Sequence, residues 1–237
     1  MKPEKFIAQI IKIENLSGDI KNYTIKVPEN FQFASGQYIS IMMEKDNKKI
    51  RRPYSIASSP ELKGKIELCI KIIQRGLLTP EINKLKKGDK IEVLGPLGFF
   101  KIEESSTDKN LVFISNGTGI GPFRSMIKTL IKNKHNKNIT LITGYQNTSL
   151  YHREFLKLEK ENSNFKFLPS LTKPEKNWKG LKGRVQEHLE SFLKENKSQI
   201  KDTDFYICGL KEMINSVKNI LIKKEIPMNS IYSEKYD

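Results

Sequence analysis

The sequence predicts two domains of different class, an all-β domain followed by an α/β domain built on a doubly wound parallel sheet. Residues 1–103 contain short runs in which apolar and polar residues alternate, with turn signals between them. The stretch from Glu103 to Asn110 is polar throughout and marks the boundary. Beyond it, continuous apolar runs alternate with amphipathic helices, which indicates parallel strands joined by right-handed crossovers. A length of 237 residues suits one to two domains, and we expect them at residues 1–103 and 109–237.

The first domain is expected to be mainly strands with one short helix. The segment Thr79-Pro80-Glu81 predicts the start of that helix, with a hydroxyl at the N-cap, proline at the first helical position and an acid in the first turn. The expected strands are Phe6–Ile13, Tyr23–Val27, Ile39–Met43, Ile66–Ile73 and one strand within Lys86–Phe100.

The second domain alternates strands and helices. The apolar run Leu111–Ser115 predicts a strand that is buried on both faces. The helix after it carries Phe123, Ile127, Leu130 and Ile131 on one stripe. Further strands are expected at Ile139–Thr143, Phe165–Leu171 and Phe205–Cys208, and further helices at Glu154–Glu161, Gln186–Glu195 and Glu212–Lys224.

Composition excludes several classes of protein. No apolar run reaches about 18 residues, and the N-terminus lacks an uninterrupted apolar leader segment, so we expect a cytoplasmic protein with no membrane partner. The two cysteines, Cys69 and Cys208, lie far apart and outside any CxxC pair, so we expect neither a disulfide framework nor a metal site. Iron–sulfur clusters usually need four cysteines, so an iron–sulfur partner would have to be a separate molecule.

The segment RRPYSIASSP, residues 51–60, concentrates chemically useful side chains. In an extended strand alternate side chains share a face, so Arg52 and Tyr54 are expected to point the same way. A guanidinium fork can bind a pyrophosphate through two hydrogen bonds, and a tyrosine ring can stack on a flat heterocycle. Ser55 could hydrogen-bond the edge of that heterocycle only if the strand twists or ends there, because strict alternation places it on the opposite face.

This segment resembles the flavin-binding signature R-x-Y-S-x-x-S of the ferredoxin-NADP reductase family, matched by Arg52, Tyr54, Ser55 and Ser58. The resemblance implies that Arg52 binds the FAD pyrophosphate, Tyr54 stacks on the isoalloxazine and Ser55 lies near the reactive flavin nitrogen. Pro53, inside the signature, is expected to contact the cofactor as well. The alternative for this stretch alone is an edge strand with a surface arginine and a half-buried tyrosine.

Two other segments of the first domain resemble the same family. Gly76, Leu77 and Thr79 fit its G-x-x-S/T element, which implies a turn that closes over the flavin pyrophosphate. Residues 95–100, GPLGFF, are similar to its G-P-x-G-x-F segment. The resemblance therefore implies that the first domain is an antiparallel β-barrel that binds FAD.

A glycine-rich turn follows the first strand of the second domain. Gly117-Thr118-Gly119 lets the backbone approach a diphosphate, and Pro122 is expected at the first helical position. The next strand ends TGYQNTS, without the acidic residue of the usual dehydrogenase fingerprint. The pattern resembles the family's G-T-G-x-x-P instead, which implies an NAD(P)-binding domain.

The end of the chain supplies further candidates. Cys208-Gly209, followed by Met213, resembles the family's C-G-x-x-x-M, which implies that Cys208 lies beside the nicotinamide carbon that gives up hydride. The alternative is a buried structural cysteine. The last seven residues resemble the family's terminal strand, which makes Glu234 and Tyr236 candidates to approach the flavin. The catalytic candidates implied by the resemblance are Ser55, Cys208 and Glu234.

Thr172 and Lys173 occupy a segment that resembles the family's adenosine contact. Many NADPH-using members carry Ser-Arg there, whereas some NADH users have a proline and a tryptophan like those of this chain. Lys173 could neutralise a 2′-phosphate as a point charge, but without the fork of an arginine. The choice between NADH and NADPH stays open.

The resemblance implies a flavoprotein oxidoreductase that transfers hydride between NAD(P)H and FAD and exchanges single electrons with a separate acidic carrier such as ferredoxin or flavodoxin. One alternative is the reductase component of an oxygenase or another electron-transfer system. A remote alternative is a basic, non-enzymatic nucleic-acid-binding module, since the net charge is +15. Lysines scattered among acidic residues favour an ordinary solvated surface and no nucleic-acid partner. FMN in place of FAD, the direction of electron flow and the oligomeric state stay open.

Overall fold

The computed structural model describes residues 2–45 and 47–236. These residues form two compact units. The first runs to Lys101 and includes Gly121–Leu130, and the second comprises Ile102–Ile120 and the chain from Ile131 onward. Met1 and Asp237, which the expected domain boundaries include, lie outside the described residues.

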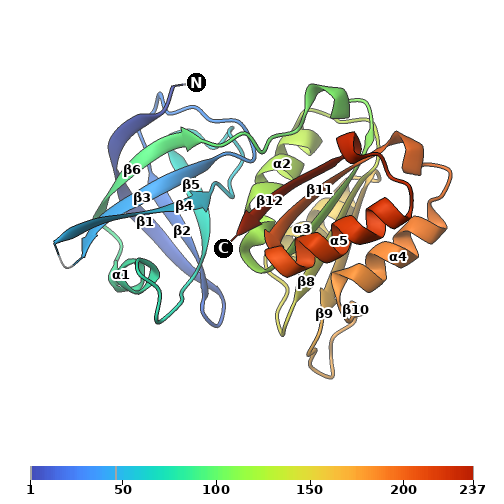
Figure 1. The fold of residues 1–237 in the computed structure, drawn as a ribbon. Coiled ribbons are helices and arrows are strands. Elements are labelled where there is room, and N and C mark those ends of the chain that lie inside the picture. The colour runs from blue at the N-terminus through green and yellow to red at the C-terminus, as the bar shows by residue number, and fades with distance from the viewer. Residues whose placement is uncertain (1, 46, 237) are drawn as a thin grey trace. The chain divides into compact units, whose positions relative to one another are not determined.

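Six antiparallel strands form the sheet of the first unit, in the order β4-β3-β6-β1-β2-β5 (Figure 1). The edge strands β4 and β5 meet through a bridge between Ile56 and Leu68 and through a hydrogen bond of 2.8 Å from the Ala57 N–H to the Glu67 carbonyl. This meeting closes the sheet, so the predicted antiparallel β-barrel is confirmed. The strands are β1 (Glu4–Ser17), β2 (Ile20–Lys26), β3 (Tyr38–Lys45), β4 (Lys48–Ser55), β5 (Lys65–Lys71) and β6 (Lys90–Leu97).

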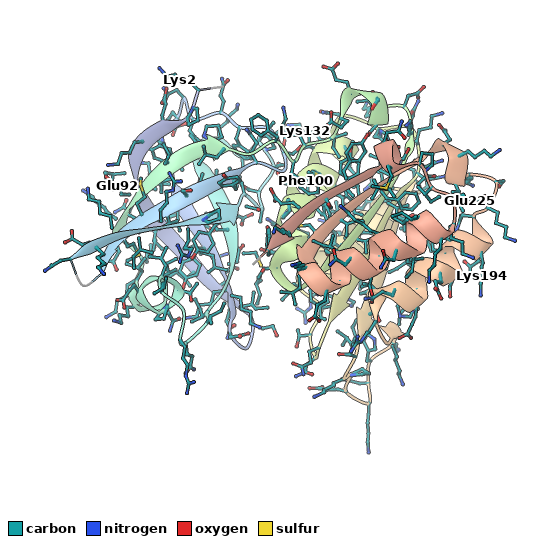
Figure 2. The ribbon with its side chains drawn as sticks, viewed as in Figure 1. Lys2, Glu92, Phe100, Lys132, Lys194 and Glu225 are labelled. Atoms are coloured by element: carbon teal, nitrogen blue, oxygen red, sulfur yellow. The ribbon has the colours of Figure 1, made fainter. Side chains whose placement is uncertain are left out.

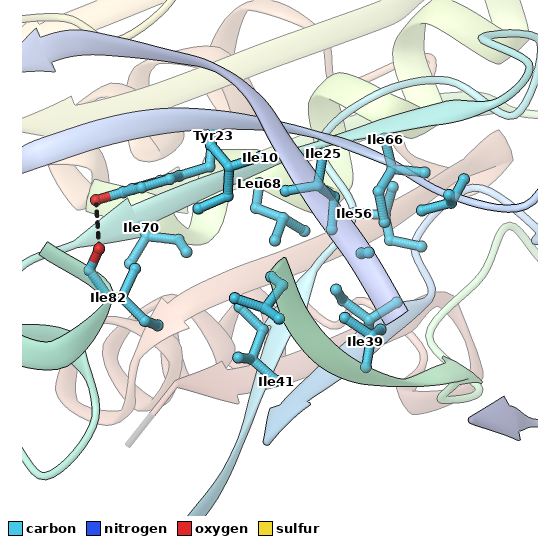
Figure 3. Packing of buried hydrophobic residues seen from close by; sticks show 14 of the residues in the cluster. Ile10, Tyr23, Ile25, Ile39, Ile41, Ile56, Ile66, Leu68, Ile70 and Ile82 are labelled. Atoms are coloured by element: carbon cyan, nitrogen blue, oxygen red, sulfur yellow. Dashed lines mark hydrogen bonds between the residues drawn. The ribbon is translucent and has the colours of Figure 1, made fainter. Parts of the chain in front are cut away.

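Alternate residues of these strands point inward and form one apolar core (Figure 3). The short helix α1 (Thr79–Lys84) contributes Ile82 to this core, and Leu78 just before the helix is buried there too. The buried Tyr23 hydroxyl donates a hydrogen bond of 3.3 Å to the Ile82 carbonyl, which ties the helix to the strands (Figure 3).

Six parallel strands form the sheet of the second unit, in the order β10-β9-β8-β7-β11-β12 (Figure 1). The chain starts in the middle at β7, builds outward through β8 and β9, and then returns to the other side of β7 with β11. A sheet of this kind binds its ligands at the carboxyl ends of the strands where the order reverses. The strands are β7 (Asn110–Asn116), β8 (Ile139–Tyr145), β9 (Phe165–Leu171), β10 (Leu181–Lys182), β11 (Thr203–Leu210) and β12 (Ile231–Tyr236).

Helices cover both faces of this parallel sheet. Helices α4 (Val185–Glu195) and α5 (Lys211–Lys223) share one apolar core with alternate residues of the central strands. On the other face, Phe155 of α3 (His152–Glu161) packs on Phe165 and Phe167 of β9. The predicted doubly wound α/β fold is therefore confirmed.

Two local predictions were wrong, and one strand was not predicted. Thr79 is not the N-cap of α1, because Leu78 occupies that position, and the Thr79 hydroxyl instead exchanges hydrogen bonds of 3.0 Å with the backbone of Ile73. Pro122 is the third residue of α2 (Ile120–Lys132), not the first, because the helix begins directly after a 3-10 turn. The strand β10 had no counterpart in the sequence prediction, since it has only two residues.

The polar stretch from Glu103 to Asn110 is more ordered than its composition suggests. It contains a 3-10 turn at Glu104–Ser106, and Ser106 is fully buried. The Ser106 hydroxyl hydrogen-bonds Asp204 at 2.6 Å and Tyr206 at 2.8 Å. Its polar side chains therefore anchor it to the second unit.

The charged side chains of Lys2, Lys194 and Glu225 are exposed on the outside of their units (Figure 2). Within residues 2–45 and 47–236, no helix combines the length and the apolar character needed to cross a bilayer. The same residues contain no cluster of three or more histidine, cysteine, aspartate or glutamate side chains that could hold a metal ion.

Candidate cofactor sites

The first candidate site lies on β4. Arg52 and Tyr54 pair in register with Ile41 and Ile39 of β3, so their side chains share a face of the strand. The Arg52 guanidinium is exposed and one of its N–H groups donates to the Arg51 carbonyl at 2.8 Å. Burial of the Tyr54 ring against the barrel core raises its pKa to about 12, while the nearby positive charge of Arg52 acts in the opposite direction. The site therefore offers a cation with free donors next to a neutral, half-buried ring.

Ser55 is the last residue of β4, opposite Tyr38 of β3. The next residue, Ile56, bridges Leu68 of β5, so the regular alternation ends at Ser55. This is the strand end that a flavin contact by Ser55 requires. Pro53 is exposed on the strand between the two predicted contacts, Arg52 and Tyr54.

Ser58, the last residue of the signature, has a structural role. It is 1% exposed, and its hydroxyl accepts a hydrogen bond of 3.1 Å from the Glu67 N–H. Its carbonyl accepts a bond of 2.6 Å from the Ser125 hydroxyl of α2. The signature segment is thereby fixed to both β5 and α2.

A compact turn follows β5. The Gly76 N–H donates to the Ile73 carbonyl at 2.8 Å, and a Cβ on Gly76 would lie only 2.9 Å from both that oxygen and the Thr79 hydroxyl. The turn therefore requires glycine at this position. Leu77 is 55% exposed, whereas the Thr79 hydroxyl is held by Ile73.

The second candidate site is the turn between β7 and α2. Gly117 has a φ of +55°, a conformation that favours glycine. Gly119 is buried, and a Cβ at this position would collide with the Cys208 carbonyl. Thr118 between them is partly exposed. The glycines thus let the backbone pass close to the end of β11 and leave the turn open to a diphosphate.

Cys208 lies beside this turn, at the carboxyl end of β11. It is completely buried and pairs in register with Ser115 of β7 and Glu234 of β12. Burial raises the Cys208 pKa well above its usual value, and the charge of Glu234 adds to the rise, while a hydrogen bond with the Tyr236 side chain opposes it. The structure therefore brings Cys208, Glu234 and Tyr236 together and keeps the thiol neutral.

Thr172 and Lys173 follow β9 directly, and both are exposed. Their N–H groups donate to the carbonyls of Tyr145 at 3.0 Å and Gln146 at 2.8 Å, so the backbone joins the carboxyl ends of β8 and β9. The two side chains are thus displayed at the same edge of the sheet as the glycine turn.

One residue that shapes the second site was not predicted from the sequence. Asn116 ends β7, and its side-chain oxygen accepts a hydrogen bond of 3.0 Å from the Leu210 N–H. Trp178, the tryptophan of the segment expected to contact the adenosine, packs on His152, with ring centroids 5.2 Å apart. A strand-terminal asparagine before a glycine turn is a visible signal, but its partner is 94 residues away and the sequence does not reveal it.

Buried hydroxyls also escaped prediction. Ser115 and Thr143 lie side by side on β7 and β8, level with Cys208, and both are fully buried. Among the described residues neither hydroxyl has a hydrogen-bond partner. The continuous run Leu111–Ser115 predicted that Ser115 is buried, but it gave no sign that the hydroxyl would lack a partner among the described residues.

The donor set suits two nucleotide cofactors. Arg52 and Tyr54 offer a phosphate ligand and a stacking ring on the barrel. In the second unit, the glycine turn packs against the backbone of Cys208, whose thiol is neutral, at the point where the strand order of the parallel sheet reverses. A chain with these two parts is a two-domain oxidoreductase that binds a flavin and a nicotinamide nucleotide.

Comparison with known proteins identifies the family. Residues 7–102 match the family described as "Oxidoreductase FAD-binding domain", and residues 113–219 match "Oxidoreductase NAD-binding domain". The chain belongs to the ferredoxin-NADP reductase family and is an FAD-dependent NAD(P)H oxidoreductase.

Its relatives include proteins of different names. The "Phenol hydroxylase P5 protein" of Acinetobacter pittii is 32% identical over 98% of this chain, which spans 66% of that longer protein. "Ferredoxin--NADP reductase B" of Sorangium cellulosum is 24% identical, with both chains covered completely. A ferredoxin NADP+ reductase from Neisseria gonorrhoeae, solved with bound FAD and NADP, has the same fold, with a TM-score of 0.83, 24% identity and 98% of each chain covered.

Proposed function

We propose that this chain takes hydride from NAD(P)H onto bound FAD and exchanges single electrons with a separate acidic carrier, ferredoxin or flavodoxin. The proposal assigns FAD to residues 1–103 and the nicotinamide nucleotide to residues 109–237. The observation that carries it is the close packing of Gly119 of the glycine turn on the backbone of Cys208, whose thiol is neutral, in a chain that also bears the flavin signature on β4. Bound FAD supplies the conversion of a hydride into two single electrons.

On the barrel, we assign Arg52 to the FAD pyrophosphate, because its donors are exposed and its fork matches two phosphate oxygens. Tyr54 offers its half-buried face for stacking. Ser55, the last residue of β4, is assigned to the edge of the flavin ring. Pro53 and the turn residues complete the proposed FAD contacts, which are Arg52, Pro53, Tyr54, Ser55, Gly76, Leu77 and Thr79.

In the second unit, the turn from Gly117 to Gly119 presents backbone N–H groups to the diphosphate. Cys208 contacts the nicotinamide without placing a negative charge there, because its thiol stays protonated. Glu234 is the acidic group beside this thiol. The proposed nucleotide contacts are Gly117, Thr118, Gly119, Thr172, Lys173, Cys208 and Gly209, and the proposed catalytic residues are Ser55, Cys208 and Glu234.

The acceptor is proposed from charge and cysteine content. With 42 basic and 27 acidic residues, the chain attracts acidic proteins. Its two cysteines are too few to ligate an iron–sulfur cluster within this sequence. The second candidate function, the reductase component of an oxygenase, is supported by the 32% identity to the phenol hydroxylase P5 protein. Family membership favours both over a nucleic-acid-binding module.

The acceptor can be tested with anaerobically reduced protein mixed with an acidic two-iron two-sulfur ferredoxin at increasing salt. We expect the rate of ferredoxin reduction to fall at least about tenfold from low to high ionic strength, because salt screens the attraction. Reduction of the flavin by NAD(P)H, measured in the same buffers, is the control and should change far less. Ferredoxin that stays oxidised at low salt would contradict this acceptor and favour an oxygenase component.

A further inference from the structure

Asn116 connects the two segments proposed to hold the nicotinamide nucleotide. It is the last residue of β7, directly before the glycine turn, at the point where the strand order of the sheet reverses. Its neighbour Ser115 pairs in register with Cys208 of β11. The Asn116 side-chain oxygen accepts a hydrogen bond of 3.0 Å from the Leu210 N–H, two residues beyond Cys208. One side chain thus joins the start of the glycine turn to the turn that follows the thiol.

The backbone around this bond has no spare room. Gly209 has a φ of +148°, and a Cβ at this position would collide with the Asn116 side-chain oxygen and lie 3.0 Å from the Met213 methyl carbon. On the other side, a Cβ on Gly119 would collide with the Cys208 carbonyl. The Asn116 amide, Gly119 and the Cys208-Gly209 peptide therefore pack as one unit, and a shift of one moves the others.

An amide is suited to this position. Leu210 is the N-cap residue of α5, and its apolar side chain makes no cap hydrogen bond. Asn116 supplies an acceptor for the Leu210 N–H, and an N–H donor requires the oxygen, not the nitrogen, of the amide to face it. Alanine at position 116 would leave the N–H without this acceptor and would open space beside Gly209.

We propose that Asn116 is a positioning residue for hydride transfer. Its side-chain oxygen fixes the turn after Cys208 against the glycine turn, so that the thiol and the diphosphate-binding backbone keep one spacing. The inference rests on the proposed function, which places the nicotinamide beside Cys208 and the diphosphate on Gly117–Gly119. A displacement of about 1 Å between reacting groups can lower the rate about a hundredfold. Loss of this single hydrogen bond is therefore expected to lower the rate of hydride transfer.

Three variants test the proposal. Asn116→Ala removes the acceptor, whereas Asn116→Asp keeps an oxygen in the same place. Asn110→Ala is the matched control, because Asn110 is the first residue of the same strand and makes two comparable contacts at the opposite edge. Its amide donates to the Asp202 carbonyl at 3.3 Å and accepts from the Asn138 N–H at 3.1 Å.

Two measurements on the FAD-loaded proteins separate positioning from structure. Hydrogen exchange of the Leu210 amide reports the bond itself, and stopped-flow reduction of the flavin at saturating nucleotide reports hydride transfer. For Asn116→Ala we expect faster exchange at Leu210 and a limiting rate lowered by about tenfold or more, with nucleotide affinity within about threefold of wild type. For Asn116→Asp we expect slow exchange and a limiting rate within about threefold of wild type, with weaker nucleotide binding because a negative charge now lies near the diphosphate. Asn110→Ala should leave both the Leu210 exchange rate and the limiting rate of flavin reduction unchanged.

Several results would overturn the inference. Unchanged Leu210 exchange in Asn116→Ala would show that the bond does not exist in solution. Faster exchange with an unchanged limiting rate would make Asn116 merely structural, and so would an Asn116→Asp protein that protects Leu210 yet reacts as slowly as Asn116→Ala. Failure of the proposed function is distinguishable, because then the wild-type flavin itself would not be reduced by either nucleotide.

Discussion

At the scale of single residues, the proposed flavin site on β4 depends most on Arg52. Its guanidinium is exposed on the same face as the half-buried Tyr54, and its described contact is with the Arg51 carbonyl. The guanidinium therefore keeps donors available for a pyrophosphate. A lysine in the same place would offer a point charge without the fork.

Replacing Arg52 by alanine should weaken FAD binding by about tenfold to a hundredfold, because hydrogen bonds to charged groups contribute about 1.5–3 kcal/mol. The measurement is the FAD content after gel filtration together with the dissociation constant from flavin fluorescence. Arg51→Ala is the matched control, since Arg51 is also exposed but points to the other face of the strand. Full flavin occupancy in Arg52→Ala, with the second unit folded, would refute the assignment.

The burial of Tyr206 predicts how the stability of the protein depends on pH. Burial raises its pKa to about 12, while hydrogen bonds with Ser106 and the Glu103 N–H act in the opposite direction. Above pH 10 the unfolded chain therefore releases the Tyr206 proton while the folded protein keeps it, so stability falls as the pH rises from about 10 toward 12. Below pH 10 this residue contributes no pH dependence.

The ultraviolet absorbance of tyrosinate during a rapid alkaline titration tests this assignment. Tyr206→Phe should lose one tyrosine from the step near pH 12 and none from the steps at lower pH. A loss from the step near pH 10 instead would show that the hydroxyl is not buried as described. The titration of wild-type protein in denaturant, where all tyrosines titrate normally, is the control.

Single residues were predicted where the local pattern fixed their direction. Strand alternation was enough to place Arg52 and Tyr54 on one face. Thr79 was wrongly predicted to be the N-cap of α1, because its hydroxyl hydrogen-bonds the backbone of Ile73 in the preceding turn and not the first turn of the helix. Asn116 was not predicted, because its hydrogen-bond partner Leu210 lies 94 residues away in the sequence and comes near only in the folded sheet.

At the scale of elements, helix α2 is tied to the flavin-signature segment. Arg124 of α2 has only 7% of its side chain exposed, donates to the Ala57 carbonyl at 2.9 Å and pairs with Glu67 of β5 at 2.6 Å. Ser125 adds its bond to the Ser58 carbonyl. The helix that follows the glycine turn is therefore joined by charged and polar contacts to the segment that follows Tyr54.

Replacing Arg124 by leucine should destabilise the first unit by about 3 kcal/mol, because Glu67 is left as an uncompensated, mostly buried charge. The double variant Arg124→Leu, Glu67→Leu should recover part of this loss. Hydrogen exchange of the buried β5 amides measures the free energy of opening.

Lys84→Ala is the matched control for this ion pair. It removes the pair of Lys84 with Glu81, which has the Lys84 side chain 72% exposed, and should cost less than about 1 kcal/mol. An Arg124→Leu protein as stable as this control would contradict the claim that the buried ion pair of Arg124 and Glu67 stabilises the first unit.

Helices and strands were predicted correctly where the pattern of apolar residues was clear. The continuous run Leu111–Ser115 became a central strand because both of its faces are buried, as its composition required. The polar stretch at Ser106 was expected to be a plain boundary, yet it is anchored by Asp204 and Tyr206. Hydrophobicity patterns do not register such polar anchors, and they also miss a two-residue strand such as β10.

At the scale of the whole molecule, order along the chain was more informative than any one motif. The flavin signature, the turn after β5, the glycine turn and Cys208-Gly209 are each short and individually weak patterns. Together they fall on a closed antiparallel barrel and on the carboxyl edge of a doubly wound sheet, which are the positions that the chemistry needs. The architecture was therefore predictable from sequence. The choice of nucleotide was not, because Thr172 and Lys173 are exposed side chains at the sheet edge without the fork of an arginine.

The most direct test of the proposed function is the visible spectrum of the purified protein before and after anaerobic addition of NADPH and, separately, NADH. We expect a yellow flavin spectrum that is bleached by a reduced nicotinamide nucleotide, and the nucleotide that bleaches it faster is the preferred donor. A colourless protein that takes up neither FAD nor FMN would contradict it, since Arg52 and Tyr54 would then mark only an exposed strand of the barrel.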